Sequence, residues 1–128
     1  PMNSPYVTEI PKFLLVALNQ LYDMERKLSL HGDAAGLGRN VQRVKEAFID
    51  GGLFYEDPMG QPFSETRTDL EASIAGAGTE NLKVAEVIKP VIRYGDRAYS
   101  RVIQKGIVVV RSDAPLVPDA APPNQDQV

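Results

Sequence analysis

The stretch PKFLLVALNQLYDMERKL (residues 11–28) decides the first half of the fold, because its apolar residues recur with the period of a helix. Steps of four, three, three and four residues separate Leu14, Leu18, Leu21, Met24 and Leu28. Pro11 suits the first helical turn, where its missing N–H is not needed. Further apolar residues widen the stripe, and a helix this apolar packs against more than one neighbour. The pattern therefore predicts a helical bundle, which a partner chain could complete.

A second helix follows a short break at His31-Gly32-Asp33. Its apolar stripe has steps of four, three and four residues, along Leu37, Val41, Val44 and Phe48. Gly51-Gly52 should end this helix, because glycine readily takes the left-handed conformation found at helix C-termini. We therefore expect a helical hairpin over residues 11–52, preceded by a flexible lead-in over residues 1–10.

Two stretches in the second half carry the alternation and the β-branched residues that favour strands. They are LKVAEVIKPVIRY (residues 82–94) and AYSRVIQKGIVVVRS (residues 98–112), and Gly95-Asp96 between them predicts a turn. Pro90 cannot donate a ladder hydrogen bond, so the first strand should break there or lie at an edge. We therefore predict an α+β protein, in which the hairpin is followed by a small all-β domain over residues 53–112, with an acidic connector.

Composition argues against several classes of function. The 128 residues carry a net charge of −3 and no block of lysine or arginine, which argues against a nucleic-acid surface. There is no cysteine and one histidine, His31, which argues against thiol catalysis and against cysteine or histidine metal sites. No apolar run approaches the length of a membrane span. We expect a cytoplasmic protein that is not an enzyme and needs no cofactor, metal, nucleic acid or membrane.

Residues 113–128 differ from the rest of the chain in composition. They hold four prolines and three aspartates but no lysine or arginine. Such a segment cannot bury enough apolar surface to offset the entropy of ordering. We therefore predict a disordered tail.

An acidic segment, EDPMGQPFSETRTDLEASIAG (residues 56–76), separates the two halves and raises the question of an active site. Thr68 and Glu71 have the spacing of a helix capping box, and residues 57–60 have the signature of a β-turn. Both patterns favour structural roles for these carboxylates. The alternative is a small hydrolase, although no cysteine and no second histidine is present to assist it. Its catalytic carboxylates would be Glu65, Asp69 and Glu71.

The order of these segments resembles the GrpE family, the nucleotide exchange factors of DnaK-type heat-shock chaperones. Residues 11–28 are similar to the first bundle helix of that family, and residues 41–63 to its second bundle helix and exit. Leu70-Glu71-Ala72 falls where the family has His-Glu-Ala. The stretches VAEVIKPVIRYG and SRVIQKGIVVV resemble its two terminal strands. The resemblance covers about residues 11–112, in order.

This sequence also departs from the family pattern. Pro90-Val91 replaces the family's Gly-Tyr turn, and Gln104-Lys105-Gly106 stands where the family has Arg-Pro-Ala. The long N-terminal coiled-coil helix is missing, which indicates a divergent or shortened member. The altered positions leave an alternative function open, namely an interaction module that binds a chaperone-like or actin-fold partner without exchange activity.

The resemblance implies a homodimer, in which two hairpins form a four-helix bundle. The dimer-interface residues that it implies are Leu14, Leu18, Leu21, Met24, Leu28, Val41, Val44 and Phe48. It also implies that the β-domain binds the nucleotide-binding domain of a DnaK-type chaperone and promotes ADP release. The implied partner contacts are Ile88, Arg101 and Val110. The residues alone leave another interpretation open, with Ile88 and Val110 in the β core and Arg101 as a solvated charge.

Overall fold

A computed structural model describes residues 9–113, which form two helices followed by six strands. The helices α1 (Lys12–His31) and α2 (Leu37–Asp50) make a hairpin, and this confirms the predicted α+β class. The strands are β1 (Leu53–Glu56), β2 (Leu70–Ala75), β3 (Leu82–Lys89), β4 (Val91–Gly95), β5 (Ser100–Gln104) and β6 (Gly106–Ser112). Most of the predicted lead-in and tail lies outside the described residues.

The helix boundaries follow the sequence signals closely. Pro11 precedes the first residue of α1, and Gly32, with φ of +88°, donates its N–H to the Leu28 carbonyl at the end. Gly51 ends α2 as predicted. The sequence analysis did not foresee the start of α2, where the Asp33 carboxylate accepts the N–H groups of Leu37 and Gly38 at 2.6 and 2.9 Å. This carboxylate satisfies two of the backbone donors that every helix start leaves unpaired.

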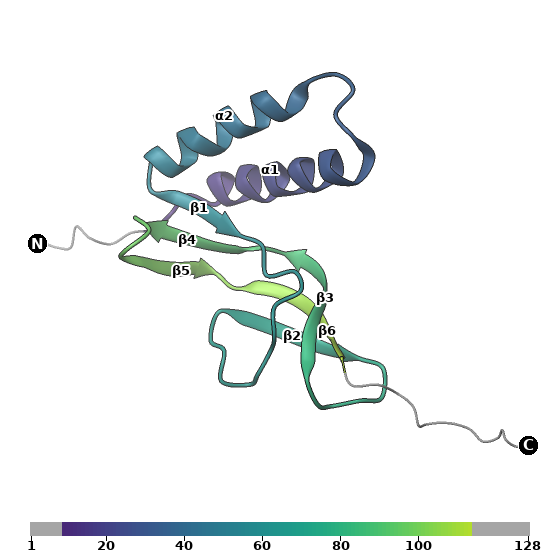
Figure 1. The fold of residues 1–128 in the computed structure, drawn as a ribbon. Coiled ribbons are helices and arrows are strands. Elements are labelled where there is room, and N and C mark those ends of the chain that lie inside the picture. The colour runs from purple at the N-terminus through teal and green to yellow at the C-terminus, as the bar shows by residue number, and fades with distance from the viewer. Residues whose placement is uncertain (1–8, 114–128) are drawn as a thin grey trace, which may run out of the picture.

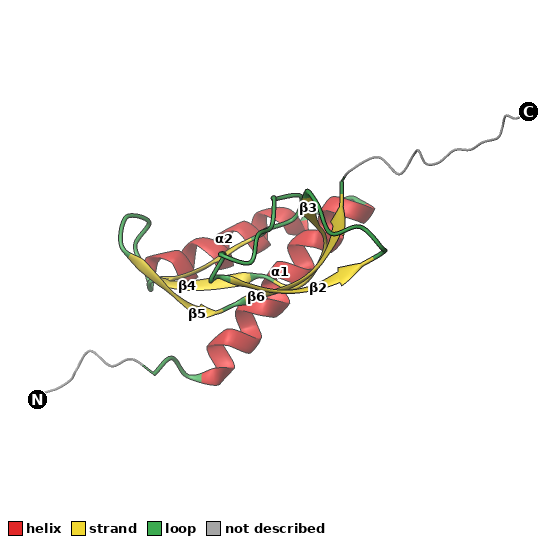
Figure 2. Cartoon of the chain, turned by 90° about the horizontal axis from the view of Figure 1, so that it is seen from below, coloured by secondary structure: helices red, strands yellow, loops and turns green. Residues whose placement is uncertain are grey.

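The strands form two three-stranded sheets (Figure 1). One sheet has the order β1–β4–β5 and is antiparallel throughout. The other has the order β2–β6–β3, with β2 parallel to β6 and β3 antiparallel to it. The hairpin covers one face of the strands, next to β1 in Figure 1, and α1 also reaches β3 of the other sheet, where Arg26 donates to the Val87 carbonyl at 3.1 Å. Both helices lie behind the strands in Figure 2.

Each predicted β stretch supplies a strand to both sheets. Pro90 ends β3 and is followed at once by β4, which confirms the predicted break at this residue. Lys105 likewise stands alone between β5 and β6. The crossing is tightly packed at Gly106, where an added Cβ would lie 2.8 Å from a methyl carbon of Leu70 and 3.0 Å from one of Val91. Glycine is therefore needed here for close approach of the two sheets.

The acidic connector contains more regular structure than the sequence predicts. The capping box expected from Thr68 and Glu71 is wrong, because Glu71 lies in β2 and pairs with Ile107. Pairing with a strand so far along the chain overrides the local spacing signal. The predicted turn near residues 57–60 exists one residue later, closed by a 3.0 Å hydrogen bond from the Gln61 N–H to the Pro58 carbonyl.

The core lies between the inner face of the hairpin and the two sheets. Leu18 of α1 and Ile92 of β4 have no exposed surface, and Val91 and Val108 are almost as completely buried. Burying side chains of this size stabilises the fold by about 1.5–3 kcal/mol each. Within residues 9–113, neither helix has the length and apolar character needed to cross a membrane.

Candidate functional site

The residues expected at a dimer interface divide into three groups in the structure. Leu18, Leu21 and Val41 are buried within the single chain, so the prediction that they contact a second copy is corrected. All three belong to the same core cluster as residues of both sheets, and Val41 also lines the space between the two helices. A second group of the expected interface residues is partly buried against the same core, namely Leu14, Leu28 and Phe48. The third group, Met24 and Val44, is about half exposed.

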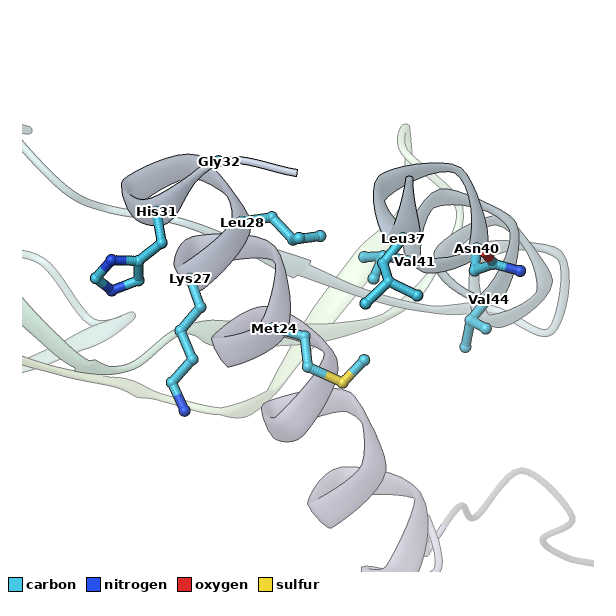
Figure 3. A pocket seen from close by; sticks show the side chains of 9 residues that line it. All are labelled: Met24, Lys27, Leu28, His31, Gly32, Leu37, Asn40, Val41 and Val44. Atoms are coloured by element: carbon cyan, nitrogen blue, oxygen red, sulfur yellow. The ribbon is translucent and has the colours of Figure 1, made fainter. Parts of the chain in front are cut away.

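An apolar groove of about 380 Å³ lies between the C-terminal part of α1 and the N-terminal part of α2. Figure 3 shows Met24 and Leu28 of α1 pointing toward α2, whereas His31 points away from it. Across the groove, α2 contributes Leu37, Val41 and Val44. Aliphatic side chains therefore make up most of the groove, and Lys27 also lines it.

Other exposed apolar residues lie on both helices. Phe13, Val16 and Met24 are spaced by three and eight residues, so they share one helix face. Leu37 and Val44, seven residues apart, share a face of α2 by the same argument. We call the surface formed by Phe13, Val16, Met24, Leu37 and Val44 the hairpin face. Exposed apolar residues grouped on one side of a helix are typical of interaction sites.

The three expected partner contacts lie in different environments. Ile88, near the end of β3, is 56% exposed. Arg101 is exposed on β5, with its guanidinium carbon 6.0 Å from the centroid of the Tyr94 ring. Val110 has no exposed surface, because it lies in β6, the central strand of its sheet. The predicted direct contact by Val110 is therefore corrected, and Ile88 and Arg101 remain accessible.

Of the three connector carboxylates considered above, Asp69 is paired with an arginine. The Arg67 guanidinium donates to both oxygens of Asp69, at 3.0 and 2.8 Å, and this hydrogen bonding lowers the pKa of Asp69. Glu65 and Glu71 are exposed. A general acid needs a raised pKa near the working pH, whereas the paired Asp69 has a lowered one. No three acidic or histidine side chains converge as metal ligands anywhere in residues 9–113.

A hydrogen-bonded cluster joins the hairpin to β1, and the sequence analysis missed it. Tyr55 donates its hydroxyl to Glu25 at 2.5 Å, and Lys45 Nζ lies 3.1 Å from both oxygens of that carboxylate. Tyr22 donates to Asp57 at 3.1 Å, and the two tyrosine rings meet edge to face with centroids 5.4 Å apart. We call these five residues the tyrosine–carboxylate cluster. They border a cavity of about 500 Å³.

The tyrosines of this cluster serve as hydrogen-bond donors. Burial, and then the charge of Asp57, raises the pKa of Tyr22 to about 12. Burial, and then the hydrogen bond to Glu25, also raises the pKa of Tyr55. Both hydroxyls therefore stay protonated near neutral pH, so neither can act as a base. Because the members come from α1, α2, β1 and the turn after it, no sequence spacing could have indicated the cluster.

Comparison with known proteins gave no match to a family model, to a curated protein or to a solved structure. The functional argument therefore rests on the chain's own residues and on the ordered resemblance described above.

Proposed function

We propose that this chain is a GrpE-like exchange factor that promotes ADP release from a DnaK-type chaperone. The observation that carries the proposal is a helical hairpin with an exposed apolar face, joined to a β region that exposes Ile88 and Arg101. Both residues are at positions that the resemblance assigns to the chaperone contact. The order of the elements along the chain also agrees with the resemblance.

The proposed mechanism requires binding and no catalytic group. The protein binds the open form of the chaperone's nucleotide-binding domain more tightly than the closed form, and shifts that equilibrium by this difference in affinity. By reciprocity, nucleotide weakens the protein's own binding by the same factor. Ile88 supplies apolar contact area, and Arg101 supplies a charge-assisted hydrogen bond to a carboxylate of the partner.

We also propose that the hairpin face pairs two copies of the chain into a four-helix bundle. Pairing across a two-fold axis would place the same five residues of both chains at the interface. This set replaces the buried residues of the original expectation with exposed ones, while keeping Met24 and Val44.

Stopped-flow release of a fluorescent ADP from the DnaK-type chaperones of the same genome tests the exchange activity. We expect the protein to accelerate release, and Arg101→Ala to lose most of the acceleration. Arg97→Ala is the matched control, because Arg97 lies on the same β hairpin, with its guanidinium carbon 5.7 Å from the Phe54 ring centroid. Binding without acceleration would reject exchange and indicate an interaction module. No binding to any of these chaperones would reject the proposed partner.

Sedimentation velocity tests the dimer separately. We expect a dimer for the unmodified chain and a monomer for a Met24→Glu, Val44→Glu double variant, because two buried carboxylates would meet their copies across the axis. Leu30→Glu is the control, since Leu30 is 71% exposed on α1 but outside the hairpin face. A monomer for the unmodified chain at high concentration would contradict the proposed bundle.

A further inference from the structure

A second groove lies at the opposite end of α1 from the groove of Figure 3. Its volume is about 750 Å³, and it runs between the first turn of α1 and the strand β5. Apolar walls come from Ile10, Leu15 and Ile103, while Lys12 and Arg101 supply positive charge. Glu9 is the only acidic residue among the lining residues that the structure describes, so the lining carries a net charge of about +1.

The strand β5 presents its outer edge to this groove. Among residues 9–113 it is the outer strand of its sheet, and the strand that pairs with it there is β4. The turn between them closes with a hydrogen bond from the Asp96 N–H to the Tyr99 carbonyl, which makes residues 96 and 99 a hydrogen-bonded pair. Hydrogen-bonded and non-bonded pairs alternate along an antiparallel ladder. The backbone groups of Ser100 and Val102 therefore point away from β4.

Two observations agree with this orientation. The Gly95 N–H, opposite Ser100, donates to the Gly52 carbonyl beside β1 and not toward β5. In the described part of the chain, no hydrogen bond reaches the outward backbone groups of Ser100 or Val102. An exposed strand edge with unpaired N–H and C=O groups is a template for another extended chain.

We propose that this groove binds an extended acidic segment of a partner protein, which adds to β5 as a further strand. Backbone hydrogen bonds to Ser100 and Val102 would give affinity. Alternate side chains would select the sequence, with apolar ones against Ile10 and Leu15 and carboxylates toward Lys12 and Arg101. The inference goes beyond nucleotide exchange, because it specifies a segment chemistry and does not require the partner to be a chaperone.

Two labelled peptides test the proposal by fluorescence anisotropy with the full chain. One alternates aspartate with valine over six residues, and the other alternates lysine with valine over the same length. We expect the acidic peptide to bind at least about tenfold more tightly, and more weakly as salt rises. Equal binding of the two peptides, or no binding of either, would overturn the inference.

Two variants separate the contributions of charge and backbone. The Lys12→Glu, Arg101→Glu double variant should reverse the preference toward the lysine peptide. Val102→Pro should abolish binding of the acidic peptide, and it removes an N–H that faces outward, a position where edge strands tolerate proline. If Val102→Pro does not fold, the charge-reversal variant decides alone, and an unchanged preference would refute the proposal.

Two other occupants of the groove are distinguished by anisotropy with a shortened chain and by sedimentation velocity of the full chain. Acidic-peptide binding that occurs only after residues 1–8 are removed would assign the groove to the chain's own N-terminal segment. Self-association that Val102→Pro abolishes, with no peptide binding, would assign it to a second copy of the chain. Either result would overturn the inference. Exchange activity is measured in a different experiment, so its failure leaves this test intact.

Discussion

Asn19 on α1 and Gln104 on β5 exchange two side-chain amide hydrogen bonds, each 2.9 Å long. Gln104 also donates to the Pro90 carbonyl at 3.0 Å, and Asn19 donates to the carbonyl of Leu15. This amide pair therefore connects the first helix to the residue where the chain passes from β3 to β4.

Removing one partner of this pair should destabilise the protein. We expect Asn19→Ala to lower the free energy of unfolding by about 1–3 kcal/mol, because the part-buried amide of Gln104 then loses both of its hydrogen bonds to Asn19. Urea denaturation measures the change. The control is Gln42→Ala, whose amide makes an exposed 3.4 Å contact with Glu46, and whose cost should stay within about 0.5 kcal/mol. Equal costs for both variants would refute this role.

The hydroxyl of Tyr55 should contribute measurably to the attachment of the hairpin. Tyr55→Phe keeps the ring and its packing but removes the hydrogen bond to the Glu25 carboxylate. We expect a loss of about 1–2 kcal/mol in unfolding free energy, since hydrogen bonds to charged groups are stronger than neutral ones. Tyr99→Phe is the control, because Tyr99 is 84% exposed. A loss no greater than that of the control would show that water replaces the bond.

Alkaline pH should destabilise the protein through Tyr22. The folded state raises its pKa from 10.0 to about 12, mainly by burial, so the folded state holds this proton more tightly than the unfolded state does. The resulting stability is complete below pH 10 and is lost as pH rises toward 12. Tyr22→Phe should therefore lose stability less steeply over that range. Identical slopes in urea denaturation series for the two proteins would contradict the prediction.

Acid should remove the contribution of the Arg67–Asp69 pair. The hydrogen bonds from Arg67 lower the pKa of Asp69 below its usual value of 3.8. The pair therefore contributes its full stabilisation above that pH, and this contribution is lost as the pH falls through the lowered pKa. We expect Asp69→Asn to cost about 1–2 kcal/mol near neutral pH, and less in acid. Glu65→Gln is the exposed control. A cost of Asp69→Asn that does not change with pH would indicate a role other than charge pairing.

Gly95 should be essential to the turn between β4 and β5. Its φ is +134°, and an added Cβ would meet the Tyr99 carbonyl oxygen and lie 2.8 Å from Ser100 Cα. Gly95→Ala should therefore cost about 3 kcal/mol, combining backbone strain with the clash. At Gly60, φ is +79° but the added Cβ would meet open space, so Gly60→Ala should cost only about 1–2 kcal/mol. Thermal unfolding of both variants tests the difference.

The sequence predicted those features that depend on neighbouring residues. The stripe beginning at Leu14 located α1, Gly51 located the end of α2, and Pro90 located the break between two strands. Each of these signals acts within a few residues along the chain, because it depends on helical period or on backbone restrictions.

Features that depend on distant pairing could not be predicted in this way. The strand β2 is set by its parallel partner β6, so Glu71 follows the ladder and not the capping pattern around it. An apolar stripe also does not reveal which neighbour covers it. Leu18 and Leu21 therefore looked equally suited to a second chain and to this chain's own sheets, and the structure places them against the sheets.

The single-residue links at Pro90 and Lys105 have a mechanical consequence for any partner. Ile88 lies just before the first link, and Arg101 lies on the strand that precedes the second. The two sheets are thus joined covalently at two nearby points, which restricts sliding of one sheet past the other and limits changes in the separation of these two residues. A partner whose own two contact points move apart would remain attached at only one of them. Discrimination between two shapes of a partner would then require no movement within this protein.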